Sequence, residues 1–155
     1  MLSITLTAFT CLVVGAQQDA PKIHAKTPMR IGQSSHVVRS AEELGKLQNI
    51  DADKASANLA KALKVQAIDW KKQMVIVVYG GTQRTGGFSV EVKSLQVKDG
   101  KLAVNWKVNG PPPGSFVTQA LTNPTLTILV DRFEGDVMFD PKTPPPGLGK
   151  KLGGS

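Results

Sequence analysis

The sequence predicts an α+β fold, with one or two short N-terminal helices packed on a mainly antiparallel sheet or small β-sandwich of about six strands. Apolar residues recur at helical spacing between Ser40 and Leu63. From Trp70 onward they alternate with polar residues, and turn residues separate the alternating segments. A chain of 155 residues, 41% of them hydrophobic, is long enough for one compact core.

The first 16 residues form an apolar run without a charged side chain, and the run ends in the small residues Gly15 and Ala16. This pattern predicts a secretory signal peptide over residues 1–16, cleaved after Ala16. The alternative, a membrane-spanning helix, is disfavoured because the run is short and rich in Ser and Thr. Cys11, the single cysteine, would leave with the signal. We therefore expect a secreted or periplasmic chain that does not span the membrane after cleavage and has no disulfide.

Two segments have the composition of flexible chain. Residues 17–34 have no regular apolar period and contain Pro21 and Pro28, which predicts a linker. Residues 141–155 are rich in Pro and Gly, which predicts an extended, solvated tail. The expected globular domain therefore covers residues 35–140.

Two helices are expected at the start of this domain. Ser40 and Glu43 have the spacing of a capping box, in which the serine accepts a hydrogen bond from the glutamate amide. Asp51 precedes a second stretch, which is rich in Ala and Lys and places Leu59 and Leu63 on one side up to residue 63. Both helices are expected to be short and amphipathic.

The strands follow. Residues 74–78 are continuously apolar, as in a strand covered on both faces, and Asp99-Gly100 predicts a tight hairpin between two alternating segments. Trp106 continues the apolar alternation of the second of these segments and should lie in the core. The expected strands lie at residues 74–78, 88–92, 102–108, 116–121, 126–130 and 137–139.

The net charge of +7 raises the possibility of nucleic-acid binding. The excess of positive charge lies in the flanking segments, whereas basic and acidic residues nearly balance between Arg39 and Asp140. A domain with balanced charge offers no basic surface for a duplex, so we expect no nucleic-acid partner.

The stretch YGGTQRTGGFSVEV, residues 79–92, places four glycines between two apolar runs. Gly81 and Gly86 have the spacing of a phosphate-binding loop, but the expected Lys and Ser or Thr are missing and a strand follows instead of a helix. Two interpretations remain open. The glycines can serve a chain reversal, and the polar residues Gln83, Arg84 and Thr85 can form a contact tip.

The binding hypothesis assigns polar contacts to Gln83 and Arg84, and assigns close approach to the partner backbone to Thr85 and the glycines. Pro111 to Gly114 are expected to form a second, neighbouring loop. The candidate binding residues are Gly80, Gly81, Thr82, Gln83, Arg84, Thr85, Gly86, Gly87, Pro112, Pro113 and Gly114.

No pattern in the sequence predicts catalysis. A hydrolase would need a nucleophile beside an oriented base, and the two histidines, His24 and His36, stand in contexts typical of a linker and a surface strand. Ser115 lacks the surroundings of a nucleophile elbow. The carboxylates at 131, 134 and 136 lack the spacing of a calcium loop and are typical of a polar turn. We expect no enzyme, no metal and no cofactor; a small hydrolase would require His36 to lie beside a serine or carboxylate.

Several motifs together resemble the PrcB C-terminal-domain family. They are I-D-W at residues 68–70, T-G-G-F-S-V-E-V at 85–92, the Asp-Gly turn, the Pro-Pro-Gly stretch and V-T-Q-A-L-T-N-P at 117–124. The similarity runs from about Ser40 to Asp140, and Trp70 stands where the family commonly has Phe. The resemblance implies an extracytoplasmic, non-enzymatic accessory or binding domain, associated with a bacterial surface protease complex, and it transfers no catalytic residue.

A second, looser likeness concerns inhibitors of the chagasin type, whose N-P-T-T-G-Y motif enters the cleft of a cysteine protease. Here the N-P-T of residues 123–125 and the T-G-G of residues 85–87 lie in different segments. The sequence thus favours an exported domain that binds another protein, with an exported protease as the candidate partner. A protease inhibitor is the alternative.

Overall fold

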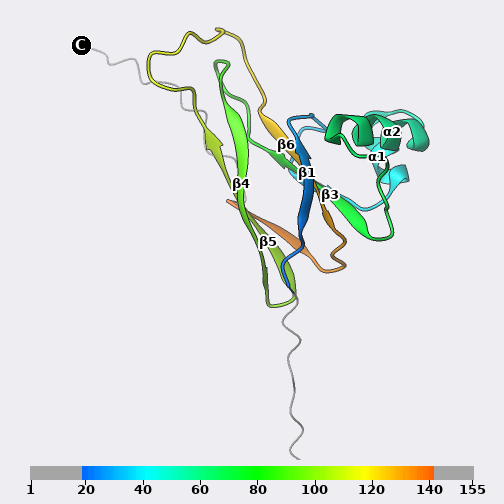
Figure 1. Cartoon of the computed structure of the whole chain (residues 1–155). Helices are drawn as coiled ribbons and strands as arrows, with labels where there is room; N and C mark the ends of the chain where they lie inside the picture. The colour runs from blue at the N-terminus through cyan, green and yellow to red at the C-terminus, as the bar shows by residue number, and fades with distance from the viewer. Residues whose placement is uncertain (1–18, 142–155) are drawn as a thin grey trace, which may run out of the picture.

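The computed structural model describes residues 19–141 and confirms the α+β fold (Figure 1). The helices and strands follow one another as β1 (Ile23–Thr27), β2 (His36–Val38), α1 (Ala41–Gln48), α2 (Ala52–Leu63), β3 (Gln73–Tyr79), β4 (Ser89–Lys98), β5 (Lys101–Asn109), β6 (Thr125–Asp131) and β7 (Val137–Asp140).

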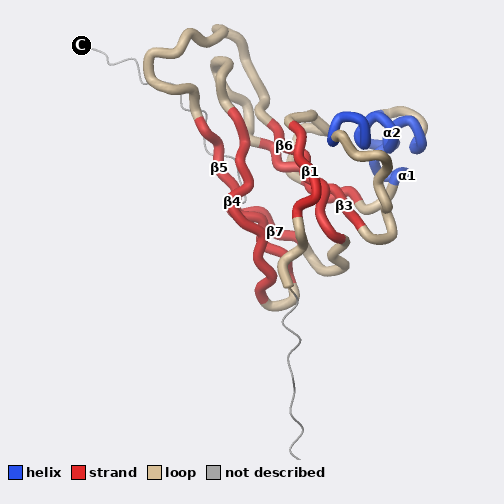
Figure 2. Tube along the Cα trace, in the orientation of Figure 1, coloured by secondary structure: helices blue, strands red, loops and turns tan. Residues whose placement is uncertain are grey.

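The elements form three layers, with a four-stranded sheet in the middle. Its strand order is β1-β6-β3-β2, and all its pairs are antiparallel. A second sheet has the order β4-β5-β7, in which β5 and β7 are parallel. Figure 2 shows the two helices on one side of the four-stranded sheet and the second sheet on the other.

Strand β3 shows why its sequence is continuously apolar. Val75 and Val77 belong to the core beneath the helices, whereas Met74, Ile76 and Val78 belong to the core between the two sheets. All five side chains are fully buried. The prediction of a strand covered on both faces is confirmed.

The helix ends follow the sequence signals. The hydroxyl of Ser40 accepts a hydrogen bond from the amide of Glu43 at 3.2 Å, and the Glu43 carboxylate accepts one from the amide of Arg39 at 2.7 Å. Asp51 caps the second helix through the amides of Asp53 and Lys54. These bonds satisfy amides that a helix start leaves unpaired, so both helices begin close to where the sequence predicts.

The predicted hairpin is also present. Asp99 and Gly100 have φ angles of 51° and 71°, as a type I′ turn requires, and join β4 to β5. Trp106 is buried, as expected, and its indole nitrogen donates a hydrogen bond to the carbonyl of Pro141 at 3.0 Å. The fold therefore includes Pro141, one residue beyond the predicted domain end, and the rest of the predicted tail lies outside the described residues.

The prediction of a linker over residues 17–34 is wrong within the described part. Ile23 to Thr27 form β1, which pairs with β6, and Ile31 is fully buried. Pro21 and Pro28 bracket this strand without interrupting it. Because β1 is an edge strand with little buried apolar surface, its sequence carries no apolar alternation. The predicted signal peptide, residues 1–16, lies outside the described residues.

The strand predicted at residues 116–121 does not form. This segment lies in the connection between β5 and β6, and both of those strands already have a neighbour on each side. The segment pairs with neither strand, and its backbone bonds instead to the connection between β3 and β4, through Thr118 and Gly86. Phe116 and Leu121 are exposed there.

Candidate binding surface

Two long connections meet at one end of the molecule. We call residues 80–87, which follow β3, the Gly loop, and residues 110–124, which follow β5, the arch. In Figure 1 the arch, drawn in yellow, passes beyond the green connection between β3 and β4. The expectation that Pro111 to Gly114 lie in a loop neighbouring the Gly loop is consistent with this arrangement.

Backbone hydrogen bonds join the Gly loop to the arch along its length. Gln83 and Thr122 form an isolated antiparallel bridge between the two segments. The bonds run from the amide of Gly80 to the carbonyl of Pro124 (2.8 Å), from Gln83 to Thr122 (2.7 Å), from Thr122 to Gln83 (2.9 Å) and from Gly86 to Thr118 (2.9 Å).

Side chains add to this connection. The amide oxygen of Asn123 accepts hydrogen bonds from the Tyr79 hydroxyl at 2.9 Å and from the Thr82 hydroxyl at 2.8 Å. The Thr122 hydroxyl donates to the carbonyl of Thr85 at 2.7 Å. Backbone and side-chain bonds together therefore hold the arch against the Gly loop.

The glycines of the loop allow this close approach. A Cβ atom on Gly86 would lie 2.4 Å from the Thr118 hydroxyl oxygen, and one on Gly87 would lie 2.8 Å from the Pro111 Cβ. Gly87 also has a φ of +82°, which disfavours any side chain. These glycines thus serve both a chain reversal and the close packing of the loop backbone against side chains of the arch.

The three polar side chains predicted to form a contact tip are not all exposed. Gln83 is 1% exposed, and its amide nitrogen donates to the carbonyl of Gly80 at 3.1 Å. Thr85 is half-buried, and Arg84 alone of the three is exposed. The expectation that Gln83 lies on the loop surface is therefore wrong, because its side chain folds back to bond the loop's own backbone.

The exposed surface lies instead on the arch. Pro112, Pro113 and Gly114 are exposed, as a contact loop requires, and Phe116 and Leu121 are 106% and 72% exposed. Sequence reasoning assigned these two residues to a strand. The available signal against a strand was their position between two proline-containing turns.

The residues next to Phe116 are anchored. Val117 is half-buried and lies against Gly87, and Thr118 accepts the amide hydrogen bond of Gly86. On the other side, the amide of Ser115 donates to the carbonyl of Pro112 at 3.1 Å. The aromatic ring of Phe116 is thus held outward by a bonded backbone.

The surface carries little charge. Residues 110–124 contain no ionisable side chain, and Arg84 is the only charged residue of the Gly loop. The surface accordingly offers apolar side chains, uncharged polar groups and one guanidinium.

The residues considered for catalysis have other roles. The Nδ1 atom of His36 lies 2.7 Å from the backbone oxygen of Ser34, and the hydroxyl of Ser35 accepts a hydrogen bond from the amide of Tyr79. Within residues 19–141, His36 makes no hydrogen bond to a serine hydroxyl or a carboxylate. The arrangement of His36 beside a serine or carboxylate, which the sequence analysis named as the requirement for a hydrolase, is therefore not formed in these residues.

The carboxylates of the last turn each have a separate partner. Asp131 pairs with His24, Glu134 with Arg132, and Asp136 with Lys101. The hydrogen bond from His24 is the main cause that lowers the pKa of Asp131, and the hydrogen bond from Arg132 lowers the pKa of Glu134. No group of three or more metal-ligating side chains occurs in the described part of the chain, and no described helix has the length and apolar character needed to cross a membrane.

Comparisons with known proteins support the resemblance found in the sequence. Neither a search of curated proteins nor a search of solved structures gave a significant match. The family model described as PrcB C-terminal matches residues 74–131, which include β3, the Gly loop, the β4–β5 hairpin, the arch and β6. The segment that builds the candidate binding surface is therefore the part of the chain that is similar to the PrcB C-terminal family.

Proposed function

We propose that this chain is an exported, non-enzymatic accessory domain that binds another protein through the arch. The family of residues 74–131 supports an accessory role in a protease complex, and the apolar, uncharged N-terminal run supports export. The candidate partner is an exported protease.

One observation carries this proposal, namely the full exposure of Phe116 on an anchored segment. Single exposed apolar residues are common on protein surfaces, but here a fully exposed aromatic ring and an exposed leucine, Leu121, lie on the same segment. Aromatic side chains are enriched among the residues that dominate binding energy at interfaces. Because hydrogen bonds already hold the neighbouring backbone, a partner would order few additional residues on binding.

The interface follows from this arrangement. Phe116 and Leu121 supply apolar contact area, Arg84 supplies a charge-assisted hydrogen bond, and Pro112 to Gly114 extend the surface along the arch. The Gly loop holds the arch in place and contributes only Thr82, Arg84 and Gly87 as exposed residues. The proposed contact residues therefore lie mainly on the arch, whereas the sequence pattern favours the Gly loop.

The test is recovery of a partner with the tagged full chain from the envelope and secreted fractions of its host, quantified by mass spectrometry. Phe116→Ser should reduce recovery of the partner by roughly ten-fold or more, because loss of a central aromatic residue commonly has this effect. Ile50→Ser, a matched change of an exposed apolar residue between the helices, should not reduce it. Equal recovery by the wild-type chain and Phe116→Ser would refute the proposal.

The inhibitor alternative gains one observation. The structure brings Asn123 and Pro124 into hydrogen-bond contact with Tyr79, Gly80 and Thr82, so that the separate N-P-T and T-G-G segments belong to the same end of the molecule. If the recovered partner is a protease, its activity should be measured with increasing amounts of the purified chain. Stoichiometric loss of activity would establish an inhibitor, whereas retained activity would establish an accessory domain.

A further inference from the structure

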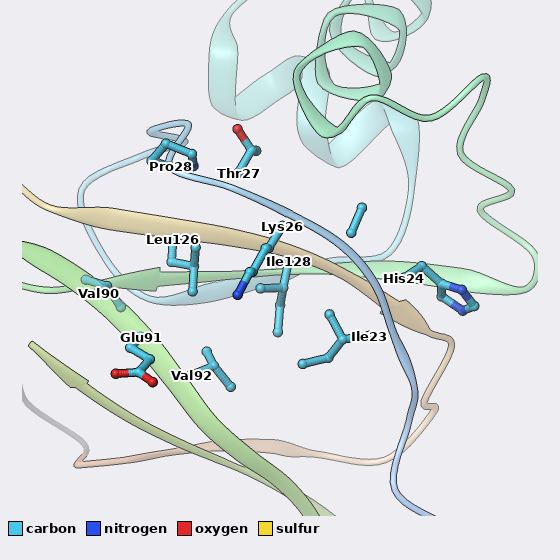
Figure 3. A pocket seen from close by; sticks show the side chains of 11 residues that line it. Ile23, His24, Lys26, Thr27, Pro28, Val90, Glu91, Val92, Leu126 and Ile128 are labelled. Atoms are coloured by element: carbon cyan, nitrogen blue, oxygen red, sulfur yellow. The ribbon is translucent and has the colours of Figure 1, made fainter.

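A groove lies beside β4, along the edge that is not paired with β5. It has a volume of about 710 Å³ and separates β1, the edge of the four-stranded sheet, from β4, the edge of the second sheet. Figure 3 shows β1 on one side and β4 on the other. Its apolar lining comprises Ile23, Val90, Val92, Leu126 and Ile128.

The groove follows the free edge of β1. Ala25 and Thr27 pair with Leu129 and Thr127, on the face that carries the helices, whereas Lys26 pairs with Ile128 on the opposite face. Nevertheless, all six consecutive residues from Ile23 to Pro28 line the groove, whichever face of the sheet their side chains occupy. It therefore runs along the strand edge, where backbone amides and carbonyls have no neighbouring strand.

Strand β4 contributes a second free edge. Three consecutive residues, Val90, Glu91 and Val92, line the groove from the side of β4 that faces away from β5. Two unpaired strand edges thus flank one apolar floor. This is the arrangement in which an extended peptide can add a strand, with backbone bonds to an edge and side chains on the floor.

The charges indicate which peptide fits. His24 is paired with Asp131, and Glu91 is paired with Lys107 at 3.1 Å. The amide of Lys22 also donates to the Asp131 carboxylate. Lys26 makes no ion pair within residues 19–141, and Figure 3 shows its ammonium group directed over the floor of the groove. The groove therefore presents one uncompensated positive charge, and its complement is a carboxylate.

We propose that this groove binds an extended peptide segment of another protein as an additional strand, with an acidic side chain opposite Lys26. The five residues of β1 span about 17 Å at the usual rise of a strand, so they match a peptide of roughly five residues. Side chains of the peptide on either side of the acidic residue lie against Leu126, which is half-buried, and Ile23, which is exposed. The site is distinct from the arch and does not depend on the function proposed for it.

Two other occupants fit the charge less well. A second copy pairing through its own β1 would bring together two strands that each carry His24 and Lys26 and directly follow Lys22. Residues 142–155 of the chain contain three lysines and no acidic residue. Like charges across a strand pair are destabilising, so an acidic partner is favoured over both.

The experiment is selection of a displayed library of random seven-residue peptides on the immobilised full chain. We expect enrichment of sequences in which an acidic residue lies among β-branched or aromatic residues. A synthetic peptide of the most enriched sequence should bind Lys26→Glu at least roughly ten-fold more weakly than the wild-type chain, because like charges then meet. Lys54→Glu, which makes the same charge change on helix α2, should leave its affinity unchanged.

A second readout locates the peptide. Amide hydrogen exchange of residues 23–27 should slow when the peptide binds, because the free edge of β1 becomes bonded. Phe116→Ser should bind the same peptide with unchanged affinity. The proposal for the groove and the proposal for the arch can therefore be refuted independently. Absence of enrichment, equal binding by Lys26→Glu, or a dimer of the full chain that protects residues 23–27 without peptide would overturn the proposal.

Discussion

The Gly loop and the arch lie against each other, yet their side chains have opposite roles. The Gly loop looks like a contact tip in sequence, with three polar residues between glycines, but Gln83 is buried and Gly86 touches the arch backbone. The arch looks like part of a strand, but its apolar residues Phe116 and Leu121 are exposed. The comparison teaches that, at this end of the molecule, polar residues hold the structure together and apolar residues face the solvent.

The largest effect that tests this comparison comes from two glycines with nearly equal φ. Gly87 (φ +82°) lies against Pro111, whereas a Cβ on Gly114 (φ +81°) would meet no atom within 4 Å. Gly114→Ala should lower the free energy of unfolding by about 1–2 kcal/mol through backbone conformation alone. Gly87→Ala should lower it by about a further 1–3 kcal/mol, since its Cβ also overpacks the contact with the arch.

Chemical denaturation of both variants measures the difference directly. An equal loss of stability in the two would contradict the close packing of the Gly loop against the arch.

The next effect separates two neighbouring polar residues. Gln83→Ala removes a buried side chain and its hydrogen bond to Gly80, and should lower the free energy of unfolding by about 2 kcal/mol. Arg84→Ala changes an exposed side chain and should alter it by less than about 0.5 kcal/mol. Thermal unfolding of the two variants provides the measurement. If Gln83→Ala were as stable as the wild-type chain, the buried Gln83 side chain would not stabilise the loop.

A smaller effect is expected from Tyr79→Phe. The change removes the hydroxyl that donates to Asn123 and keeps the ring, so the cost should be about 1 kcal/mol. Asn123→Ala should cost a similar amount, and the double variant should cost less than the sum if both act through the same hydrogen bond. Additive losses in denaturant titrations would place the stabilising contacts elsewhere.

The smallest effect concerns the far end of β6, outside the pair of loops. The hydrogen bonds from His24 and from the backbone of Lys22 lower the pKa of Asp131 below its ordinary value of 3.8. A carboxyl with a lowered pKa in the folded state contributes stability that is present above its unfolded pKa and is lost as the pH falls through its folded pKa. The pairing of β1 with β6 should therefore weaken below about pH 4.

Amide exchange of residues 22–27 between pH 5 and pH 2, corrected for intrinsic exchange, checks this prediction. In Asp131→Asn the pairing should be weaker at pH 5 and should vary less with pH. An unchanged pH dependence in that variant would assign the acid sensitivity to other groups.

Much of the fold could be predicted from the sequence, because in the helices and in most strands the local sequence signals agree with the burial of the side chains. The caps at Ser40 and Asp51, the turn at Asp99-Gly100 and the apolar run of β3 each have a local physical cause. Strand β1 could not be predicted, because an edge strand needs little apolar alternation and is specified by its partner β6.

The motifs located the two loops in the sequence but not the exposure of their side chains. The exposure of Phe116 depends on how the arch backbone bonds to the Gly loop, which a sequence does not reveal. The burial of Gln83 depends in the same way on the carbonyl of Gly80, which only the folded loop brings within reach.

The central claim is that a partner contacts the arch at Phe116. The most direct measurement places a photoreactive benzoyl-phenylalanine at position 116 of the full chain, in its native host, and identifies cross-linked proteins by mass spectrometry. The account predicts an abundant adduct with one exported protein from position 116, and none from position 50 between the helices. Absence of an adduct at position 116, or the same adducts at both positions, would contradict it.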